Sequence, residues 1–314
     1  MTETVEKALA LWDLQGATWD LIAARENHVY RVERGDVRCA LRLHRRGYRT
    51  DVELRSELAW MQAATARGLG VPRPITSATD QLLHLVDGVQ VSVLSWISGK
   101  PLGQTGVPLD IANRCDLFRT IGSEMARLHD VADSWTPPPE FERCRWDRAG
   151  LLGDTPLWGR FWDSPALSDK DRALFRGLRS ALDAELAKYE ADLDFGLIHA
   201  DLVRENIMID GAEVRMIDFD DFGYGFRLFD IATFLFKNRA EPDYEALQKA
   251  CLDGYRAMRD IDLSALDVFV LLRALTYVGW IVPRMHEPGA QTRNARYVQI
   301  ARALAARYQG ASAA

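Results

Sequence analysis

The feature that most constrains this chain is a pair of short apolar runs separated by a strong turn signal. Residues 207–209 and 214–217 are rich in β-branched and other apolar side chains, and Asp210-Gly211 between them is typical of tight hairpin turns. Two antiparallel strands joined in this way bring the residues at their outer ends together. We therefore expect Asn206 and Asp218 to lie close to each other at the open end of this hairpin.

A third oxygen-bearing side chain, Asp201, precedes Asn206 by five residues in the loop that enters the first strand. Such a cluster suits a hard cation that holds phosphate, because Mg²⁺ takes oxygen ligands and usually only one or two protein carboxylates. Phosphoryl transfer needs a carboxylate that orients the acceptor hydroxyl and accepts its proton, a metal-binding carboxylate and a second metal ligand. We predict that Asp201, Asp218 and Asn206 fill these roles in that order.

Residues 199–206, H-A-D-L-V-R-E-N, resemble the protein-kinase catalytic loop H-R-D-x-x-x-x-N, and Asp218-Phe219 resembles the start of D-F-G. The forms H-A-D and I-D-F-D-D are more similar to the aminoglycoside phosphotransferase and choline kinase superfamily. Together with the segment L-R-L-H-R-R-G-Y-R, they look most like its homoserine-kinase-type and stress-response-kinase branch. The resemblance spans roughly residues 20–285.

This resemblance implies an α+β, protein-kinase-like fold with two lobes, and a length of 314 residues also exceeds what one compact core usually supports. We expect a small N-terminal antiparallel β lobe with one helix at residues 1–94, which binds the nucleotide. A hinge is expected at 95–99. A large, mostly helical lobe at 100–314 is expected to carry the catalytic loop and the acceptor site.

The first hundred residues alternate short β-like runs with one clear helix. Hairpins are predicted over residues 29–43 and 82–94, each around a turn that contains glycine. Between them, Thr50 and Glu53 form a capping-box pattern that predicts a helix ending at Gly68. Helices are expected later in the chain at residues 111–129, 169–189, 229–238, 244–259, 263–282 and 291–308.

The strand predicted at residues 37–43 places Arg42 on the face opposite to Cys39 and Leu41. We predict that Arg42 holds the ATP phosphates, because arginine stays charged and offers a planar fork to phosphate oxygens. Protein kinases place lysine here, whereas arginine is similar to choline kinases. Glu57 has no cation one helical turn away, which indicates a distant partner, and Arg42 is our choice. The alternative is a half-exposed strand arginine and an ordinary helix glutamate.

The loop that covers the ATP phosphates is expected at residues 25–30, where Asn27 and His28 are candidate nucleotide contacts. No glycine occurs in this segment, which departs from the G-x-G-x-x-G pattern of protein kinases. Hinge backbone groups are expected to bind the adenine edge. They are those of Ser95, Trp96 and Ile97.

Asp220 and Asp221 are interpreted either as further metal or acceptor ligands or as a solvated acidic turn. His199 is expected to hydrogen-bond the loop backbone rather than to transfer protons, and the resemblance implies that Asp230 braces the catalytic loop. His129 is interpreted as an ordinary helix-end histidine. A set of mainly aromatic and polar residues either lines the acceptor pocket or packs in the core. The candidate acceptor-binding residues are Asp221, Tyr224, Tyr277, Trp280 and Arg284.

Composition argues against several partners and locations. A formal net charge of -6 argues against a whole-surface affinity for nucleic acid or anionic lipid. The four cysteines are scattered without a C-x-x-C pair, and the first residues lack the order of a secretion signal, so a cytoplasmic protein with reduced thiols is expected. The apolar stretch 268–282 is interrupted by Arg273, and we expect a buried core helix rather than a membrane span.

The expected function is transfer of the γ-phosphate of ATP, with Mg²⁺, to the hydroxyl of an amino alcohol, a homoserine-like compound or an aminoglycoside-like compound. A Ser/Thr protein kinase of the stress-response type is the alternative. Only eleven residues separate Asp218 from Asp230, which leaves little room for an activation loop and favours a small molecule. A non-catalytic nucleotide-binding protein with the same fold is the third possibility. The glycine-free covering loop favours that possibility, and the complete Asp201, Asn206 and Asp218 set disfavours it.

Overall fold

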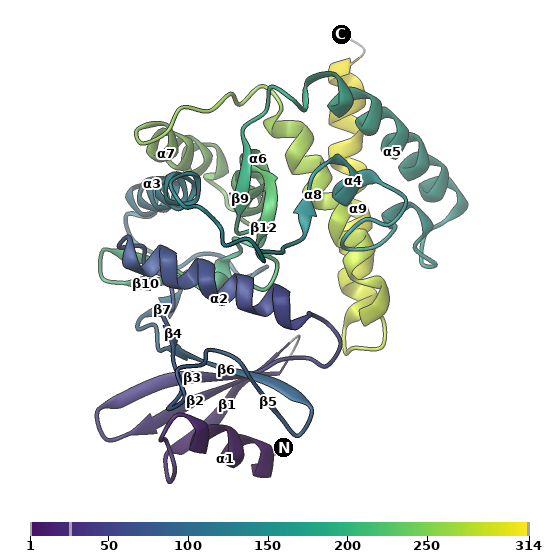
Figure 1. Ribbon diagram of the computed structural model, residues 1–314. Coiled ribbons are helices and arrows are strands. Elements are labelled where there is room, and N and C mark those ends of the chain that lie inside the picture. Colours follow the sequence, from purple (N-terminus) through teal and green to yellow (C-terminus); the bar gives the residue numbers. More distant parts are fainter. Residues whose placement is uncertain (1, 25–26, 313–314) are drawn as a thin grey trace. The chain divides into compact units, whose positions relative to one another are not determined.

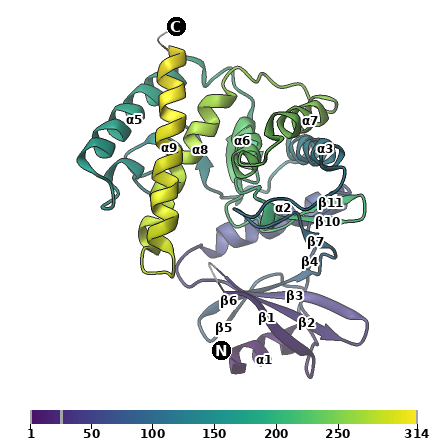
Figure 2. The ribbon, with the colours of Figure 1, turned by 180° about the vertical axis from the view of Figure 1, so that it is seen from behind.

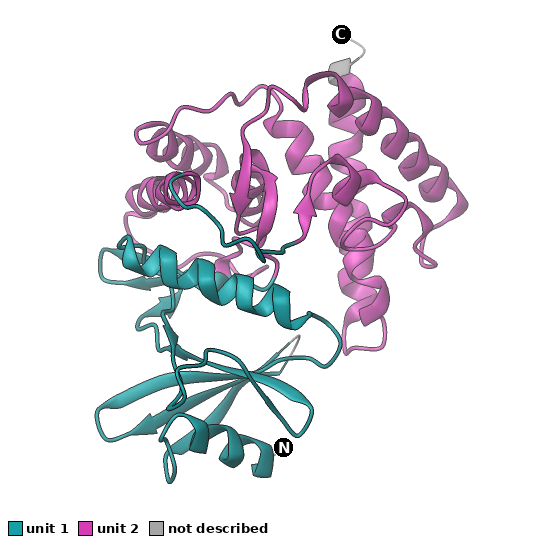
Figure 3. Cartoon of the chain, in the orientation of Figure 1, with its two compact units in different colours: residues 1–102, 134–143, 205–220 teal, residues 103–133, 144–204, 221–314 magenta. Residues whose placement is uncertain are grey.

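The computed structural model describes residues 2–24 and 27–312, with side chains described through residue 310 (Figure 1). The chain has the expected α+β fold class, with an antiparallel sheet in its N-terminal part and mainly helices in its C-terminal part. It forms two compact units (Figure 3), which are described separately below. Unit 1 comprises residues 1–102, 134–143 and 205–220, and unit 2 comprises residues 103–133, 144–204 and 221–314.

The main sheet of unit 1 is antiparallel and has six strands. Five of them follow the order β1-β2-β3-β6-β4, and β5 also pairs with β6. The two hairpins predicted from the sequence are β2–β3 and β5–β6, and the strand predicted at residues 37–43 has those bounds. The strands are β1 (Thr18–Ala24), β2 (His28–Arg34), β3 (Val37–Leu43), β4 (Pro74–Ile75), β5 (His84–Val86) and β6 (Val89–Ser95).

Helix α1 (Thr2–Leu11) packs on one face of this sheet (Figures 1 and 2) and was not predicted. Its buried Val5, Ala8 and Leu9 follow the i, i+3, i+4 spacing of an amphipathic helix. They join a core cluster that includes Cys39 and Leu41 from β3. The expectation of one helix in this part of the chain was therefore wrong, because this short helix is stabilised by burial against the sheet.

Helix α2 (Asp51–Ala66) begins at the predicted capping box. The Oγ1 of Thr50 accepts a bond from the Glu53 N–H at 3.1 Å, and the Glu53 carboxylate accepts one from the Thr50 N–H at 2.9 Å. Gly68 follows the helix with a φ of +79°, a conformation that glycine adopts readily. Both predicted ends of the helix are thus confirmed within two residues.

A second sheet of unit 1 has the order β11-β10-β7, formed by β7 (Lys100–Pro101), β10 (Ile207–Asp210) and β11 (Glu213–Met216). Gly99, before β7, has a φ of +101°, and a Cβ there would collide with the carbonyl of Ile209. The pairing of β10 with β7 explains why residues 205–220 belong to unit 1 although they directly follow residues 144–204 of unit 2. The hinge at residues 95–99 stays a prediction.

Unit 2 contains a small sheet with the order β8-β12-β9, in which β12 runs antiparallel to β9 and parallel to β8. Its strands are β8 (Arg145–Trp146), β9 (Phe195–Ile198) and β12 (Gly223–Phe226). Helices pack around it, with α3 against α7 and α8 against α9 (Figures 1 and 2). The helices are α3 (Arg114–Asp133), α4 (Arg148–Leu152), α5 (Asp169–Tyr189), α6 (Arg227–Asn238), α7 (Tyr244–Arg256), α8 (Leu266–Trp280) and α9 (Ala290–Ser312), and the 3-10 turns are η1 (Phe161–Asp163), η2 (Arg204–Asn206) and η3 (Val282–Arg284).

The six helices predicted for this part are all present, and no observed end lies more than four residues from the predicted one. Helix α5 has the predicted bounds, because Ser168 caps it by accepting a bond from the Asp171 N–H. Among the described residues, one segment, Leu266–Arg284, is long and apolar enough to cross a membrane, but 78% of its apolar window is buried. This burial agrees with the expectation of a core helix.

Candidate active site

The predicted hairpin is present in unit 1 and brings its two ends together. Strands β10 and β11 pair in register from Ile207 opposite Met216 to Asp210 opposite Glu213. One step beyond the ladder, the Ile217 N–H donates to the backbone carbonyl of Asn206 at 2.9 Å. Asn206 and the residue after Ile217, Asp218, therefore lie at the open end of the hairpin, as expected. Their roles as metal ligands stay a prediction.

Asp218 adopts a left-handed backbone conformation, with a φ of +68°. Aspartate enters this region more readily than most residues other than glycine, yet the conformation still costs about 1 kcal/mol. Its side chain is exposed, whereas Asn206 is buried. Such backbone outliers cluster at functional sites, where the surrounding structure holds them in place.

Arg42 on β3 is buried against two carboxylates of unit 1. Its Nη1 donates to Oε1 of Glu57 on α2 at 2.6 Å, and its Nη2 donates to Oδ1 of Asp220 at 3.1 Å. Burial lowers the pKa of Arg42, but the charges of Glu57, Asp220 and Asp218 outweigh it and hold the pKa above its ordinary value. Burial raises the pKa of Glu57, while Arg42 and Arg143 bring it below its ordinary value. The predicted Arg42–Glu57 pair is confirmed as an ion pair.

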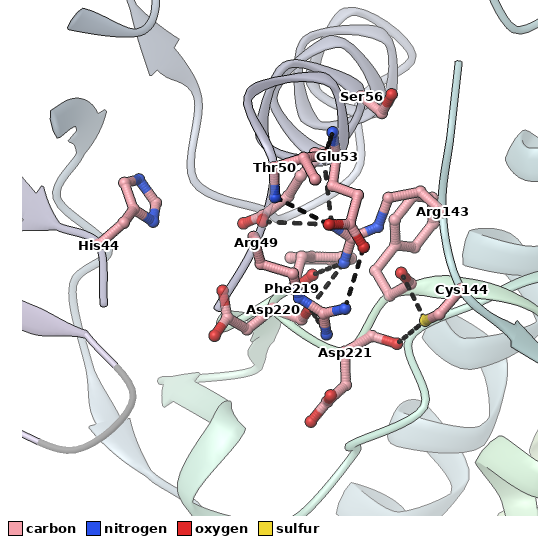
Figure 4. Close-up of polar contacts among 12 residues, drawn as sticks. His44, Arg49, Thr50, Glu53, Ser56, Arg143, Cys144, Phe219, Asp220 and Asp221 are labelled. Carbon is pink, nitrogen blue, oxygen red and sulfur yellow. Dashed lines mark hydrogen bonds and ion pairs between the residues drawn. The ribbon is translucent and has the colours of Figure 1, made fainter. Parts of the chain in front are cut away.

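Asp220 is buried, with 7% of its surface exposed, so it does not belong to a solvated acidic turn. Two further arginines hold its backbone (Figure 4). Arg49 donates to the Asp220 carbonyl at 2.8 Å, and Arg143 donates to the carbonyls of Phe219 and Asp220 at 3.2 and 2.6 Å. Arg143 also donates to the Glu53 carbonyl in the first turn of α2 at 3.2 Å. The segment that follows the predicted metal ligand is therefore tied to the start of α2.

Two of the six residues in the predicted phosphate-covering loop, 25 and 26, lie outside the described residues. Asn27 is buried, and its Oδ1 accepts a bond from the Arg45 N–H at 3.3 Å. His28 begins β2 opposite Leu43. The contacts of Asn27 and His28 with ATP stay a prediction.

The predicted adenine-binding segment begins at the last residue of β6. The Ser95 N–H donates to the Arg73 carbonyl at 2.7 Å, and the Ser95 hydroxyl accepts a bond from the Arg73 N–H at 2.8 Å. The Ser95 N–H is thus engaged within unit 1. Trp96 and Ile97 follow it and are half-buried.

Asp201 belongs to unit 2, and its side chain is held by a buried arginine. The Nη2 of Arg273 on α8 donates to Oδ1 of Asp201 at 2.6 Å and to the hydroxyl of Tyr277 at 2.8 Å. Arg273 is completely buried, whereas one quarter of the Asp201 side chain is exposed. The only charged side chain in the core of α8 therefore points to the predicted catalytic carboxylate.

The backbone of the catalytic loop is held by Asp230 on α6, as the resemblance implied. The Asp230 carboxylate accepts bonds from the N–H groups of His199 and Ala200 at 2.8 and 2.6 Å. Ala200 has a φ of +66°, so this bracing holds a strained backbone. The His199 ring accepts a bond from the Asp201 N–H at 3.3 Å. His199 thus serves the loop backbone, in agreement with its expected role.

Three of the five candidate acceptor-binding residues meet at Trp158, a residue that was not predicted from the sequence. Trp158 lies 5.5 Å from Tyr277 and 6.1 Å from Trp280, measured between ring centroids. Its Nε1–H donates to Oδ1 of Asp221 at 3.5 Å. No periodicity in the sequence marks Trp158, because it lies in the irregular segment between α4 and η1.

The other two candidates contact different partners. The Arg284 guanidinium lies 4.2 Å from the Trp280 ring, so it joins the group at its edge. Tyr224 instead lies 5.2 Å from the guanidinium of Arg145. Tyr277 is buried, and burial raises its pKa well above the ordinary value. Tyr277 therefore packs against the rings of Trp158 and Trp280 and is not an exposed ligand.

Comparison with known proteins identifies the class to which this fold and site belong. A sequence profile of a phosphotransferase enzyme family matches residues 18–261. The solved structure of a microcompartment-associated aminopropanol kinase is 29% identical, covers 99% of this chain and 98% of its own, and superposes with a TM-score of 0.86. A homoserine kinase of Agrobacterium fabrum (strain C58) is 25% identical over 234 residues, which are 73% of this chain and 68% of the relative.

A solved amicoumacin kinase in complex with AMP-PNP, Ca²⁺ and Ami shares the fold. It is 19% identical, covers 95% of this chain and 92% of its own, and has a TM-score of 0.76. The protein is thus a kinase-fold phosphotransferase that uses ATP and a small hydroxyl-bearing acceptor. The chain belongs to the phosphotransferase enzyme family that includes the aminoglycoside phosphotransferases.

Proposed function

We propose that this enzyme transfers the γ-phosphate of Mg²⁺-bound ATP to the hydroxyl of a small amino alcohol. The acceptor oxygen forms a bond to the γ-phosphorus while the bond between that phosphorus and the oxygen bridging to the β-phosphate breaks. The hydroxyl proton passes to the carboxylate of Asp201, and ADP leaves. The observation that carries the proposal is the contact of Asp201, through Arg273 and Tyr277, with the group of candidate acceptor residues at Trp158.

Asn206 and Asp218 are the residues that would hold the metal. An amide and a carboxylate are oxygen donors, the type that Mg²⁺ prefers, and the triphosphate supplies further oxygens. When bound, Mg²⁺ would neutralise charge on the phosphate oxygens. Arg42, held by Glu57, is proposed to bind the same phosphates, and the backbone of Trp96 and Ile97 the adenine. In the part of the chain that the structure describes, no three His, Cys, Asp or Glu side chains gather into a metal site of their own.

An amino group on the acceptor is supported by the chemistry around Trp158. A carboxylate, Asp221, and the half-buried indoles of Trp158 and Trp280 are groups that attract an ammonium ion. The 29% identical structure is named as an aminopropanol kinase, which acts on an acceptor of this class. We therefore favour a short amino alcohol over a large aminoglycoside.

A phosphate-transfer screen tests the proposal. The full-length enzyme is incubated with radiolabelled ATP, Mg²⁺ and single acceptors, namely 1-amino-2-propanol, ethanolamine, choline, homoserine, an aminoglycoside and casein. We expect the highest kcat/KM with a short amino alcohol, and at least about tenfold lower kcat/KM for the same alcohol without its amine. Transfer to casein alone, or to no acceptor, would contradict the proposal.

Two variants separate the proposed roles. Asp218→Ala should abolish transfer and metal-dependent ATP binding. Asp201→Asn should preserve ATP binding and lower turnover by at least about a hundredfold, because the positioned proton acceptor is lost. If Asp218→Ala consumed ATP at the rate of the natural enzyme, the proposed mechanism would be wrong.

We also propose a cytoplasmic location, supported by the four cysteines, which are all free thiols. Fractionation of the source cells, with detection by antibody, tests this proposal. Recovery in a secreted or periplasmic fraction would contradict it.

A further inference from the structure

Arg273 is a buried cation whose position is unusual for a core residue. It lies within the apolar helix α8, is 0% exposed and has one carboxylate, Asp201, within ion-pair distance among the described residues. Burying a guanidinium is costly unless it is paired and hydrogen-bonded. Its Nε and Nη1 have no hydrogen-bond partner in the described part of the chain. Core packing alone does not offset this cost, so the groups around the guanidinium must do so.

Aromatic rings hold the guanidinium in one place. Its central carbon lies 4.2 Å from the Trp158 ring, 4.5 Å from the Tyr277 ring and 5.3 Å from the Phe229 ring. These faces offset part of the desolvation cost through cation–π attraction. They also restrict the rotamers of Arg273, so that the direction of its Nη2–H bond to Asp201 is set before any substrate binds.

The catalytic loop has an arginine of its own, but that residue is engaged elsewhere. Arg204, three residues after Asp201, donates to the Asn238 side chain, the Val107 carbonyl and the Glu241 carboxylate at 2.8, 2.7 and 2.6 Å. The cation that contacts Asp201 therefore comes from α8, 72 residues later in the chain. Asp201 is thus held from two directions, through its loop backbone by Asp230 and through its side chain by Arg273.

We propose that Arg273 is a positioning residue for Asp201 in the transfer step. Its bond to Oδ1 of Asp201 fixes the direction of the carboxylate and aims it at the acceptor hydroxyl. Trp158 contacts both Arg273 and Asp221, and it therefore links the orientation of the Asp201 carboxylate to the candidate acceptor-binding residues. The proposal rests on the proposed role of Asp201, and it predicts that loss of Arg273 lowers kcat without a matching loss of substrate affinity.

The test compares Arg273→Met, Arg273→Lys and a control, Arg259→Met. Arg259 is another arginine of unit 2. It is half-buried, and its partners are Asp130, Asp133 and Asp194. Each variant is checked by its melting temperature and by ADP titration, and then assayed with the best acceptor from the screen. We expect Arg273→Met to lower kcat at least about tenfold, with KM for ATP and acceptor changed less than about threefold.

Arg273→Lys should restore part of the lost kcat, because it returns the charge without the planar fork. Arg259→Met should lower the melting temperature while the kcat of the folded protein is unchanged. The inference would be overturned if Arg273→Met kept a kcat within about twofold of the natural enzyme. It would also be overturned if its kcat fell only in proportion to ADP binding and folded fraction. Failure of the proposed function is distinct, because the natural enzyme would then transfer phosphate to casein alone or to no acceptor.

Discussion

The Nε2 of His129 lies 3.1 Å from Oδ2 of Asp230, and both side chains are completely buried. Burial, followed by the charge of Arg227, lowers the pKa of His129 to about 4, so the ring is neutral near pH 7. The Tyr255 hydroxyl lies 2.8 Å from its other nitrogen. The helix-end interpretation of His129 was therefore incomplete, because the residue supports the carboxylate that braces the catalytic loop.

This histidine makes the folded protein sensitive to acid. Below pH 6.5 His129 is protonated in the unfolded chain but stays neutral in the folded protein. Its contribution to the free energy of unfolding is therefore complete above pH 6.5 and is lost as the pH falls towards about 4. The pKa difference corresponds to about 3 kcal/mol. His44, with a pKa lowered to about 3 by burial and Arg42, acts in the same direction. Urea denaturation of His129→Gln at pH 7 and pH 4.5 should show a smaller acid-induced loss than the natural protein.

The control for this prediction is His286→Gln, since His286 is exposed. It should leave the acid-induced loss unchanged. An equal loss of stability in His129→Gln and the natural protein would show that His129 does not cause it.

Glu57→Gln should weaken both the fold and ATP binding. The substitution leaves buried Arg42 with Asp220 as its remaining charged partner at bonding distance, and breaking a buried pair from one side costs about 3 kcal/mol. We expect KM for ATP to rise at least about tenfold, because Arg42 is no longer directed to the phosphates. Glu213→Gln, which removes an exposed partner of Arg215, is the control and should cost less than about 1 kcal/mol. An unchanged KM for ATP in Glu57→Gln would disprove the phosphate-binding role of the pair.

Arg143→Met should raise the Mg²⁺ concentration that half-maximal activity requires. Arg143 holds the carbonyls of Phe219 and Asp220, directly after Asp218, and its loss frees the segment that carries the predicted metal ligand. Titration of activity with Mg²⁺ at saturating ATP should give a half-saturation at least about fivefold higher. Arg67→Met, an exposed arginine at the end of α2, serves as the control and should leave the titration unchanged. A normal Mg²⁺ titration in Arg143→Met would contradict the positioning of Asp218 by this arginine.

Gly122→Ala should destabilise unit 2, whereas Gly177→Ala should not. A Cβ on Gly122 of α3 would collide with the Cys251 carbonyl of α7, and one on Gly177 of α5 would enter open space. We expect a loss of about 2 kcal/mol for Gly122→Ala from overpacking. Gly177→Ala should gain about 0.5 kcal/mol from the better helix propensity of alanine. Thermal unfolding of both variants checks this, and equal melting temperatures would refute the close packing of α3 on α7.

Local physics made the hairpin, the capping box and the strand of Arg42 predictable from the amino-acid sequence. Asp210-Gly211 specifies the turn between β10 and β11 through contacts within a few residues. Thr50 and Glu53, three residues apart, form the capping box of α2. The pairing of Arg42 with Glu57 could also be inferred, because a carboxylate without a local cation needs a distant one. Helix α1 was missed because its burial against the sheet depends on the whole of unit 1.

The sequence by itself determined the chemical repertoire, namely Asp201, Asn206 and Asp218 at spacings typical of a phosphotransferase, and the local elements that carry them. Only the tertiary structure decided which cation holds Asp201 and which histidine supports Asp230, because these partners are 72 and 101 residues apart along the chain. Their contacts depend on how helices pack, and helix packing is set by the summed shape of many side chains rather than by any short pattern. Arg273 stood out in the sequence as a charge in an apolar helix, and the fold places that charge against Asp201.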